Sequence, residues 1–240
     1  MISRFRIFSG PNGSGKSTFF EKLKIEKIIH TEIYVSADRI EKSIKEDGKF
    51  VFNAYHISSS EREFFKHITE HGLWARILSN HKPNQIFSLK GGILEIHKNI
   101  QNSYSAALIA DYLIKKIFIS GQSFCYETVM SHKSKLELFS FAKKLNYKTY
   151  LYFIYTENPT INIERIEYRA KFGGHEVPEE KIRNRLPLSI KNSMKAFGLA
   201  DSAYIINNTL NDFKLVASKL EQQIKWRDGK AKKILQTYVE

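Results

Sequence analysis

Short apolar runs alternate with segments of helical spacing along most of the chain. The runs typical of buried strands lie at 4–9, 33–36, 123–127, 148–155 and 203–206. Apolar residues at helical spacing predict helices at 18–29, 105–119, 133–145, 161–172 and from 178 onward. Strands that alternate with helices form parallel sheets with right-handed crossovers. The pattern therefore predicts an α/β fold with a parallel sheet flanked by helices.

Two segments depart from this alternation. Between about 48 and 104 the periodicity loosens around a Lys-Pro-Asn turn at 82–84 and a Gly-Gly pair at 91–92, and we interpret the segment as a helical insertion. The last 30 residues look helical and basic. A chain of 240 residues suits one well-packed α/β domain, and no internal repeat or low-complexity linker divides it. We therefore expect residues 1–240 to form a single domain that carries an insertion.

The composition narrows the class of protein. Hydrophobic residues make up 42% of the chain, which is enough for a packed core and excludes general disorder. The apolar stretch 106–118 contains Asp111, Lys115 and Lys116, so we expect no membrane-spanning segment. The first strand begins near residue 4 and leaves no room for a signal peptide, and Cys125 is the only cysteine. These features favour a cytoplasmic protein.

The chain is also strongly basic. Lysine and arginine number 38 against 25 acidic residues, which gives a formal net charge of +13. Such a surface attracts anions. Nucleotide phosphates, a phosphorylated substrate, nucleic acid and an acidic protein all fit, and charge alone does not choose among them.

Residues 10–17, GPNGSGKS, match the phosphate-loop pattern G-x-x-x-x-G-K-[ST] at every fixed position, between a predicted strand and a predicted helix. Backbone amides of such a loop wrap a β-phosphate at a helix N-terminus. Lys16 is expected to reach the β- and γ-phosphate oxygens, and Ser17 to hold Mg²⁺. The protein should therefore use ATP or a similar nucleoside triphosphate. The predicted cofactor-binding residues are Gly10, Asn12, Gly13, Ser14, Gly15, Lys16, Ser17 and Thr18.

Polar residues follow two further predicted strands, at the sheet edge where ligands bind in such folds. Asp38 comes directly after the second strand, where its carboxylate can accept the proton of a substrate hydroxyl that attacks the γ-phosphate. Alternatively, Asp38 organises Mg²⁺ or caps a helix at 39–45. Glu127 and Thr128 end the third strand, where they can bind a polyhydroxylated substrate or a metal-bound water. A cap on the next helix also explains Thr128.

Four arginines flank a glycine-rich turn at 173–175, Gly-Gly-His, within two predicted helices: Arg165, Arg169, Arg183 and Arg185. Phosphoryl transfer needs cations that close over the γ-phosphate, and this hairpin suits such a lid. The alternative is a solvated helix face. Arg165 and Arg169 lie four residues apart, and like charges at that spacing destabilise a free helix, which favours an anionic partner. His175 either contacts phosphate or is satisfied by the turn itself.

These motifs in this order resemble the zeta toxin family of P-loop kinases, in its smaller chromosomal branch. The similarity covers about two-thirds of the chain, in the stretches 9–18, 35–40, 106–147, 151–192 and 200–208. ETVMSH and GGHEVPEEKIRNR are the specific parts. The resemblance implies a kinase that uses ATP and Mg²⁺ to phosphorylate the 3′-hydroxyl of UDP-N-acetylglucosamine or a related UDP-amino sugar, and an antitoxin protein as partner.

The resemblance also assigns roles to residues. It implies that Asp38 is the base, that Lys16 and Ser17 contact nucleotide and Mg²⁺, and that Glu127 and Thr128 form part of the substrate edge. Among the lid arginines it implies Arg169 and either Arg183 or Arg185, of which we take Arg185 as catalytic.

Three other functions remain open from the sequence. A polynucleotide 5′-kinase would use the basic charge and stacking aromatics, but most Tyr and Phe residues lie at core spacing in predicted strands, so we do not expect nucleic acid as a partner. A kinase for another nucleotide, such as NAD, is the second alternative. The third is an ATP switch of the ABC type, whose signature loop Ser88–Gly92 matches only poorly.

Overall fold

Within residues 2–78, 80–172 and 177–238, which the computed structural model describes, seven strands form one sheet in the order β10-β9-β8-β7-β1-β6-β2. β1 (Arg4–Ser9) lies between β6 (Phe124–Thr128) and β7 (Lys148–Tyr155), and pairs with both in parallel. β8 (Ser202–Asn207) pairs in parallel with β7, and β2 (Tyr34–Ser36) ends the sheet beside β6. The predicted α/β fold with a parallel sheet is therefore confirmed.

The sequence predicted that the last 30 residues are helical, and this prediction is wrong for most of them. β9 (Lys214–Leu220) and β10 (Gln223–Trp226) extend the sheet in antiparallel pairing, and within the described residues 211–238 the only helix is α10 (Gly229–Gln236). Lysines obscure the strand pattern of β9. The Lys219 side chain is buried and its Nζ donates to the carbonyl of Ala200 at 2.8 Å, at the end of a long helix. Burial of a charged residue that caps a helix terminus is a tertiary effect, which periodicity does not detect.

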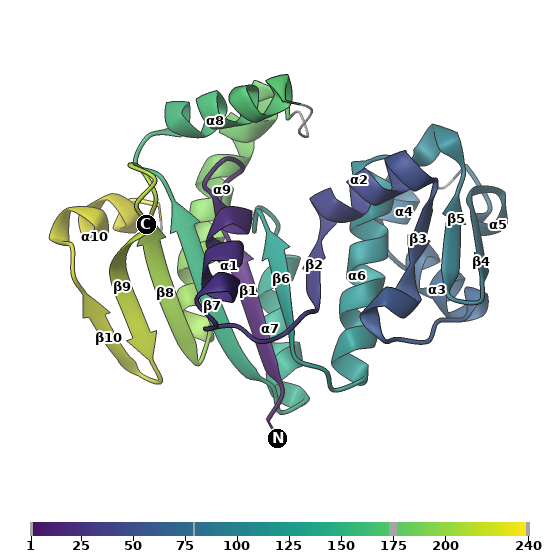
Figure 1. The fold of residues 1–240 in the computed structure, drawn as a ribbon, viewed down its shortest axis with the longest axis horizontal. Helices are drawn as coiled ribbons and strands as arrows, with labels where there is room; N and C mark the ends of the chain where they lie inside the picture. The colour runs from purple at the N-terminus through teal and green to yellow at the C-terminus, as the bar shows by residue number, and fades with distance from the viewer. Residues whose placement is uncertain (1, 79, 173–176, 239–240) are drawn as a thin grey trace. The chain divides into compact units, whose positions relative to one another are not determined.

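Helices cover both faces of the sheet (Figure 1). α1 (Lys16–Ile25) follows β1 and lies in front of the sheet in this view, while α7 (Ser134–Lys144) and α9 (Glu179–Leu199) lie behind it. α8 (Pro159–Lys171) links β7 to α9. This arrangement leaves the β1–α1 turn at the carboxyl edge of the sheet, where side chains from neighbouring strands converge.

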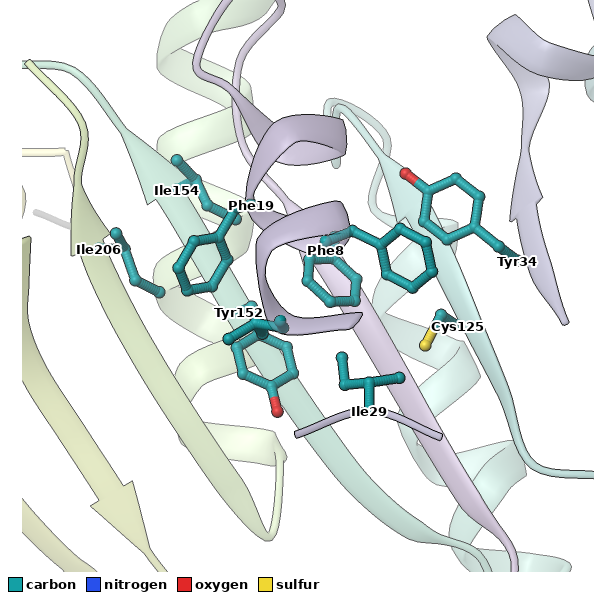
Figure 2. Close-up of a cluster of buried hydrophobic side chains, with 10 residues drawn as sticks. Phe8, Phe19, Ile29, Tyr34, Cys125, Tyr152, Ile154 and Ile206 are labelled. Atoms are coloured by element: carbon teal, nitrogen blue, oxygen red, sulfur yellow. The ribbon is translucent and has the colours of Figure 1, made fainter. Parts of the chain in front are cut away.

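An aromatic cluster fixes α1 to the sheet (Figure 2). Phe8 of β1 stacks on Tyr152 of β7 with ring centroids 4.8 Å apart, and Phe20 of α1 stacks on Tyr34 at 4.0 Å. Each fully buried phenylalanine contributes about 1.5–3 kcal/mol. The other buried members are Phe19, Leu23, Ile29, Cys125, Ile154 and Ile206. Burial raises the pKa of the Cys125 thiol to about 12, so this side chain is a packing group rather than a nucleophile.

The described residues divide into two compact units, Met1–Tyr34 with Ser123–Glu240, and Val35–Gln122. The smaller unit begins inside β2. Its elements are α2 (Ala37–Asp47), β3 (Lys49–Val51), the 3₁₀ turn η1 (Phe52–Tyr55), α3 (Glu61–Thr69), α4 (Gly72–Ile77), α5 (Pro83–Ile86), β4 (Phe87–Lys90), β5 (Ile93–Ile96), η2 (Lys98–Ile100) and α6 (Ser103–Ile119). None of the helices within the described ranges is long and apolar enough to span a membrane.

The predicted helical insertion is only partly helical. Its described part contains a three-stranded antiparallel sheet in the order β3-β5-β4. Gly91 and Gly92 form the β4–β5 turn with φ of 56° and 80°, which glycine adopts without strain. A Cβ at Gly92 would lie 2.1 Å from Asn53 Oδ1, and Asn53 Nδ2 donates to the Gly91 carbonyl at 3.1 Å. The Gly-Gly pair therefore marks a hairpin, which periodicity alone missed because both strands are short.

Asp201 ties the start of β7 to the start of β8, and its removal gives a pH-dependent test of the fold. Its Oδ2 accepts from the backbone N–H of Thr149 at 2.8 Å and from the Thr149 hydroxyl at 2.7 Å, and Lys143 lies 3.7 Å from Oδ1. Burial alone raises the pKa of Asp201, but the bonds from Thr149 and the nearby lysines outweigh it and hold the pKa below its ordinary value of 3.8.

We expect Asp201→Asn to destabilise the protein at pH 7, because it removes the charge that accepts both bonds from Thr149. The cost should be only about 1 kcal/mol, since solvent screens this partly exposed carboxylate. A lowered folded-state pKa stabilises the fold above the unfolded value and loses that contribution as pH falls through the folded value. The loss in free energy of unfolding caused by Asp201→Asn should therefore reach its full size above about pH 5 and shrink below about pH 4. Urea denaturation at several pH values measures it, with exposed Asp212→Asn as the control; a penalty independent of pH would contradict the ionic role.

Candidate functional site

The phosphate loop connects β1 to α1 in the larger unit. Gly10, Gly13 and Gly15 have φ of 143°, 77° and 95°, values that side chains other than glycine rarely adopt. Ser14 N–H donates to the Pro11 carbonyl at 3.3 Å and closes the turn. Gly15 is the N-cap of α1 and has no side chain to bond the first-turn amides. These N–H groups and the helix dipole form an anion site.

The loop is packed against two neighbouring segments. A Cβ on Gly10 would lie 1.9 Å from the Ile154 carbonyl oxygen at the end of β7, and one on Gly13 would lie 2.4 Å from the Asn162 carbonyl oxygen in α8. Both contacts involve backbone atoms, which do not move aside as a flexible side chain does. The glycines are therefore required by the surroundings of the loop as well as by its φ angles.

We expect Gly13→Ala to weaken ATP binding at least about tenfold and to cost about 2–4 kcal/mol in free energy of unfolding, from left-handed strain plus the clash with Asn162. Gly121→Ala is a matched control, because Gly121 has a similar φ of 72° with nothing within 4 Å of the added Cβ. It should cost only about 1–2 kcal/mol. Chemical denaturation and nucleotide titration measure both effects. An equal loss in free energy of unfolding for Gly13→Ala and Gly121→Ala would contradict this prediction, because the contact with Asn162 would then add no cost.

Several buried polar atoms around the loop have no hydrogen-bond partner among the described residues. They are Ser9 Oγ, Asn12 Oδ1, Ser14 Oγ, Asn162 Nδ2 and Asn208 Oδ1. An unsatisfied buried polar group costs about 1–3 kcal/mol, so such groups normally meet a ligand or ordered water. Three of the five, the two serine hydroxyls and the Asn162 amide nitrogen, are donors that suit phosphate oxygens, whereas the two asparagine oxygens are acceptors. Together with the glycine cradle, this donor set fits the phosphates of a nucleoside triphosphate.

Lys16 begins α1 and its side chain is buried beside the loop. Its Nζ donates to the Pro11 carbonyl at 3.0 Å, so the ammonium lies across the loop. A buried ammonium at an anion site lowers the cost of bringing phosphate charge there. The position suits the predicted contact with the β- and γ-phosphates.

Ser17 and Glu127 meet at the carboxyl edge of the sheet, as their predicted positions required. Ser17 Oγ donates to Glu127 Oε2 at 2.8 Å, and the buried Tyr34 hydroxyl donates to the same oxygen. The bond to Glu127 uses the Ser17 proton and leaves the oxygen lone pairs of Ser17 available, which is the orientation a metal ligand needs. The sequence did not predict Tyr34 as a site residue, because a tyrosine inside a predicted strand is normally a buried core residue.

Thr128 does not cap the next helix. Its Oγ1 accepts from Met130 N–H at 3.1 Å and closes a turn after β6, while the N-cap of α7 is Lys133. The helix-cap interpretation of Thr128 is therefore wrong.

Asp38 is the second residue of α2, in the smaller unit, and its side chain is exposed. The N-cap of α2 is Ser36, so the interpretation of Asp38 as the cap residue is also wrong. The carboxylate still lies in the first turn of the helix, directly after β2.

The four lid arginines have different surroundings. Arg165 donates to backbone carbonyls of the phosphate loop and of the segment after β8. Exposed Arg183 pairs with Glu179 at 2.7 Å on α9. Arg169 is exposed on α8, and Arg185 is half-buried on α9. The turn Gly173-Gly174-His175 lies outside the described residues.

Comparison with known proteins gives the fold. No protein-family model matches the chain, and no curated protein matches it. Among solved structures, the AvrRxo1-ORF1:ORF2 complex with ATP matches with a TM-score of 0.63 and 12% identity over 98% of this chain and 63% of that one. The same complex with sulphate ions gives 0.62 and 13% identity. The chain thus spans less than two-thirds of the length of these structures.

Another similar structure is the PezAT chromosomal toxin-antitoxin system of Streptococcus pneumoniae, with a TM-score of 0.51 and 12% identity over 99% of this chain and 84% of that one. The chain therefore shares the fold of these structures. At these identities the likeness shows the fold alone, and the roles of individual residues rest on the geometry described above.

Proposed function

We propose that this protein is an ATP-dependent kinase that phosphorylates a hydroxyl of a small molecule, with a UDP-N-acetyl amino sugar or a related nucleotide-linked compound as acceptor. The observation that carries the proposal is the bond between Ser17 and Glu127 beside a glycine cradle. It joins a phosphate-binding loop to a carboxylate at the carboxyl edge of the sheet. One of the structural neighbours was crystallised with ATP, which supports the same donor.

Magnesium fits the loop when it is bound with the nucleotide. Ser17 and Glu127, whose side chains are bonded to each other at 2.8 Å, would supply two oxygen ligands to it, directly or through water. Among the described residues, no group of three or more His, Cys, Asp or Glu gathers to hold a metal by itself. This fits Mg²⁺, which usually keeps several waters and relies on one or two carboxylates plus substrate phosphates.

Each residue of the site then has its own role in the transfer. Bound ATP supplies the γ-phosphoryl group. Lys16 and the loop amides hold the phosphates and offset their charge, while Ser14 and Asn162 donate further bonds. Asp38 takes the proton from the acceptor hydroxyl, and Thr128 and Glu127 contribute to acceptor binding. Arg169 and Arg185 of the helical hairpin offset charge on the transferring group.

The UDP-amino sugar is proposed from the sequence resemblance to zeta toxins, and the same resemblance supports a role as the toxin of a toxin-antitoxin pair. Two of the similar structures are described as a two-component complex and a toxin-antitoxin system. We therefore propose an antitoxin protein as the partner of this chain, in a cytoplasmic setting.

The proposal is tested by incubating the protein with Mg²⁺, ATP and a panel of acceptors, with products read by mass. The panel contains UDP-sugars, free nucleotides, NAD and a 5′-hydroxyl oligonucleotide. We expect one added phosphate on a UDP-amino sugar. A phosphate on NAD or on the oligonucleotide instead would support the corresponding alternative kinase, and ATP loss without any phosphorylated acceptor would support an ATP switch.

A further inference from the structure

Arg165 is the central residue of a contact between three segments that lie far apart in the sequence. Its Nη2 donates to the carbonyls of Asn208 at 2.8 Å and Thr209 at 3.2 Å, and its Nη1 donates to the carbonyl of Gly13 at 3.5 Å. The guanidinium therefore links α8 to the phosphate loop and to the segment that follows β8. Burial lowers the pKa of Arg165, as expected for a cation whose neighbours are neutral carbonyls.

Asn208 completes this contact from the other side. Its Nδ2 donates to the carbonyl of Ser14 at 2.8 Å, and a Cβ on Gly15 would lie 2.4 Å from the same nitrogen. Two successive carbonyls of the loop, those of Gly13 and Ser14, are thus bonded from outside.

Holding these carbonyls orients the amides that follow them. In a trans peptide unit the C=O and the next N–H point in opposite directions within one plane. A carbonyl that is fixed outward therefore aims the following N–H toward the opposite side of the loop. The bond from Asn208 orients the N–H of Gly15 in this way. The bond from Arg165 fixes the peptide unit whose N–H, that of Ser14, donates to the Pro11 carbonyl at 3.3 Å and closes the turn.

We infer that Arg165 and Asn208 form a loop clamp, a pair of positioning residues that keep the turn of the phosphate loop closed and hold the Gly15 amide in its anion-binding orientation. The inference rests on the proposed ATP-dependent function and reassigns Arg165, which the sequence had grouped with the lid arginines. A lid arginine acts on the γ-phosphate, whereas the loop clamp acts on the cradle of the β-phosphate. The two roles predict different nucleotide preferences.

The fork of the guanidinium is the feature to test, because one planar group bonds three carbonyls. Lysine keeps the charge but presents a point donor without this geometry. We therefore expect Arg165→Lys to weaken binding of both ADP and ATP by the same factor, about tenfold or more. Asn208→Ala should do the same, and the double variant should lose less than the product of the single effects, since both residues hold one loop.

Lys171→Ala is the matched control, because Lys171 is an exposed cation on the same helix. Calorimetric titration of the full chain with Mg-ADP and Mg-ATP gives the affinities. An Arg165→Lys variant that binds ADP normally and ATP weakly would overturn the loop clamp in favour of a γ-phosphate contact. Normal affinity for both nucleotides would also overturn it.

A second measurement does not depend on nucleotide. Hydrogen–deuterium exchange of the protein without nucleotide should show faster exchange in peptides covering 10–18 and 207–213 for Arg165→Lys and Asn208→Ala, with the β6 peptide unchanged. Unchanged exchange in both peptides would overturn the clamp. A faster rate everywhere would mean general destabilisation and would also overturn it. If wild-type protein binds no ATP while the exchange result holds, the proposed function fails and the clamp stands.

Discussion

Lys16→Ala is expected to reduce phosphoryl transfer by about 10³-fold or more. Lys16 is the buried cation at the phosphate loop, and its ammonium lies 3.0 Å from the Pro11 carbonyl, within the segment that wraps the phosphates. Alanine removes a buried positive charge from the loop, so the transferring phosphoryl group loses a counter-charge that is held beside it. Loss of the bond to Pro11 costs about 1 kcal/mol in free energy of unfolding.

The measurement is transfer of the γ-phosphate to acceptor, together with ATP affinity and thermal unfolding. Lys22→Ala provides the control, because Lys22 is an exposed lysine of the same helix. Lys22→Ala should retain the wild-type transfer rate. A Lys16→Ala protein that is folded and transfers phosphate within about tenfold of wild type would contradict the phosphate contact.

Asp38→Ala should lower transfer by about 10²–10⁴-fold while leaving ATP affinity within about twofold of wild type. A base acts on the acceptor hydroxyl and makes no contact that ATP binding requires. Asp38 suits this role because it is exposed and is not used as the N-cap of its helix. Asp47→Ala, at the other end of α2, removes an exposed carboxylate from the same element and should have no effect on either quantity.

The magnesium dependence of the Asp38→Ala variant separates the two remaining interpretations. If Asp38 organises Mg²⁺, raising the Mg²⁺ concentration should restore much of the lost rate. If it is the base, excess Mg²⁺ should not restore the rate. Transfer at the normal rate would show that Asp38 has neither role.

Local signals in the sequence predicted the donor side of the site well. The loop at 10–17 has glycines where φ is positive, and a lysine and a serine where the helix begins. Glu127 was predicted at the same sheet edge because parallel strands end together, and the structure brings it to 2.8 Å from Ser17. The strand β7 was predicted with its observed bounds, since its buried aromatic and aliphatic residues give a strong pattern.

Features that depend on distant segments were not predictable in this way. Arg165 is read from sequence as a lid residue, because nothing near it shows that its partners are the carbonyls of Gly13, Asn208 and Thr209. β9 was taken for helix because its lysines hide a strand whose buried charge is satisfied by a helix terminus. The β4–β5 hairpin did have a local signal, since Gly91-Gly92 between short apolar runs is typical of a hairpin turn.

The measurement that tests the kinase proposal most directly follows the γ-phosphate itself. Protein, Mg²⁺, ATP labelled on the γ-phosphate and a UDP-amino sugar are incubated together, and the label is located by separation of the products. The account predicts label on a hydroxyl of the sugar with wild-type protein, and none with Lys16→Ala or Asp38→Ala. Label found only in inorganic phosphate with wild-type protein, across every acceptor in the panel, would contradict it.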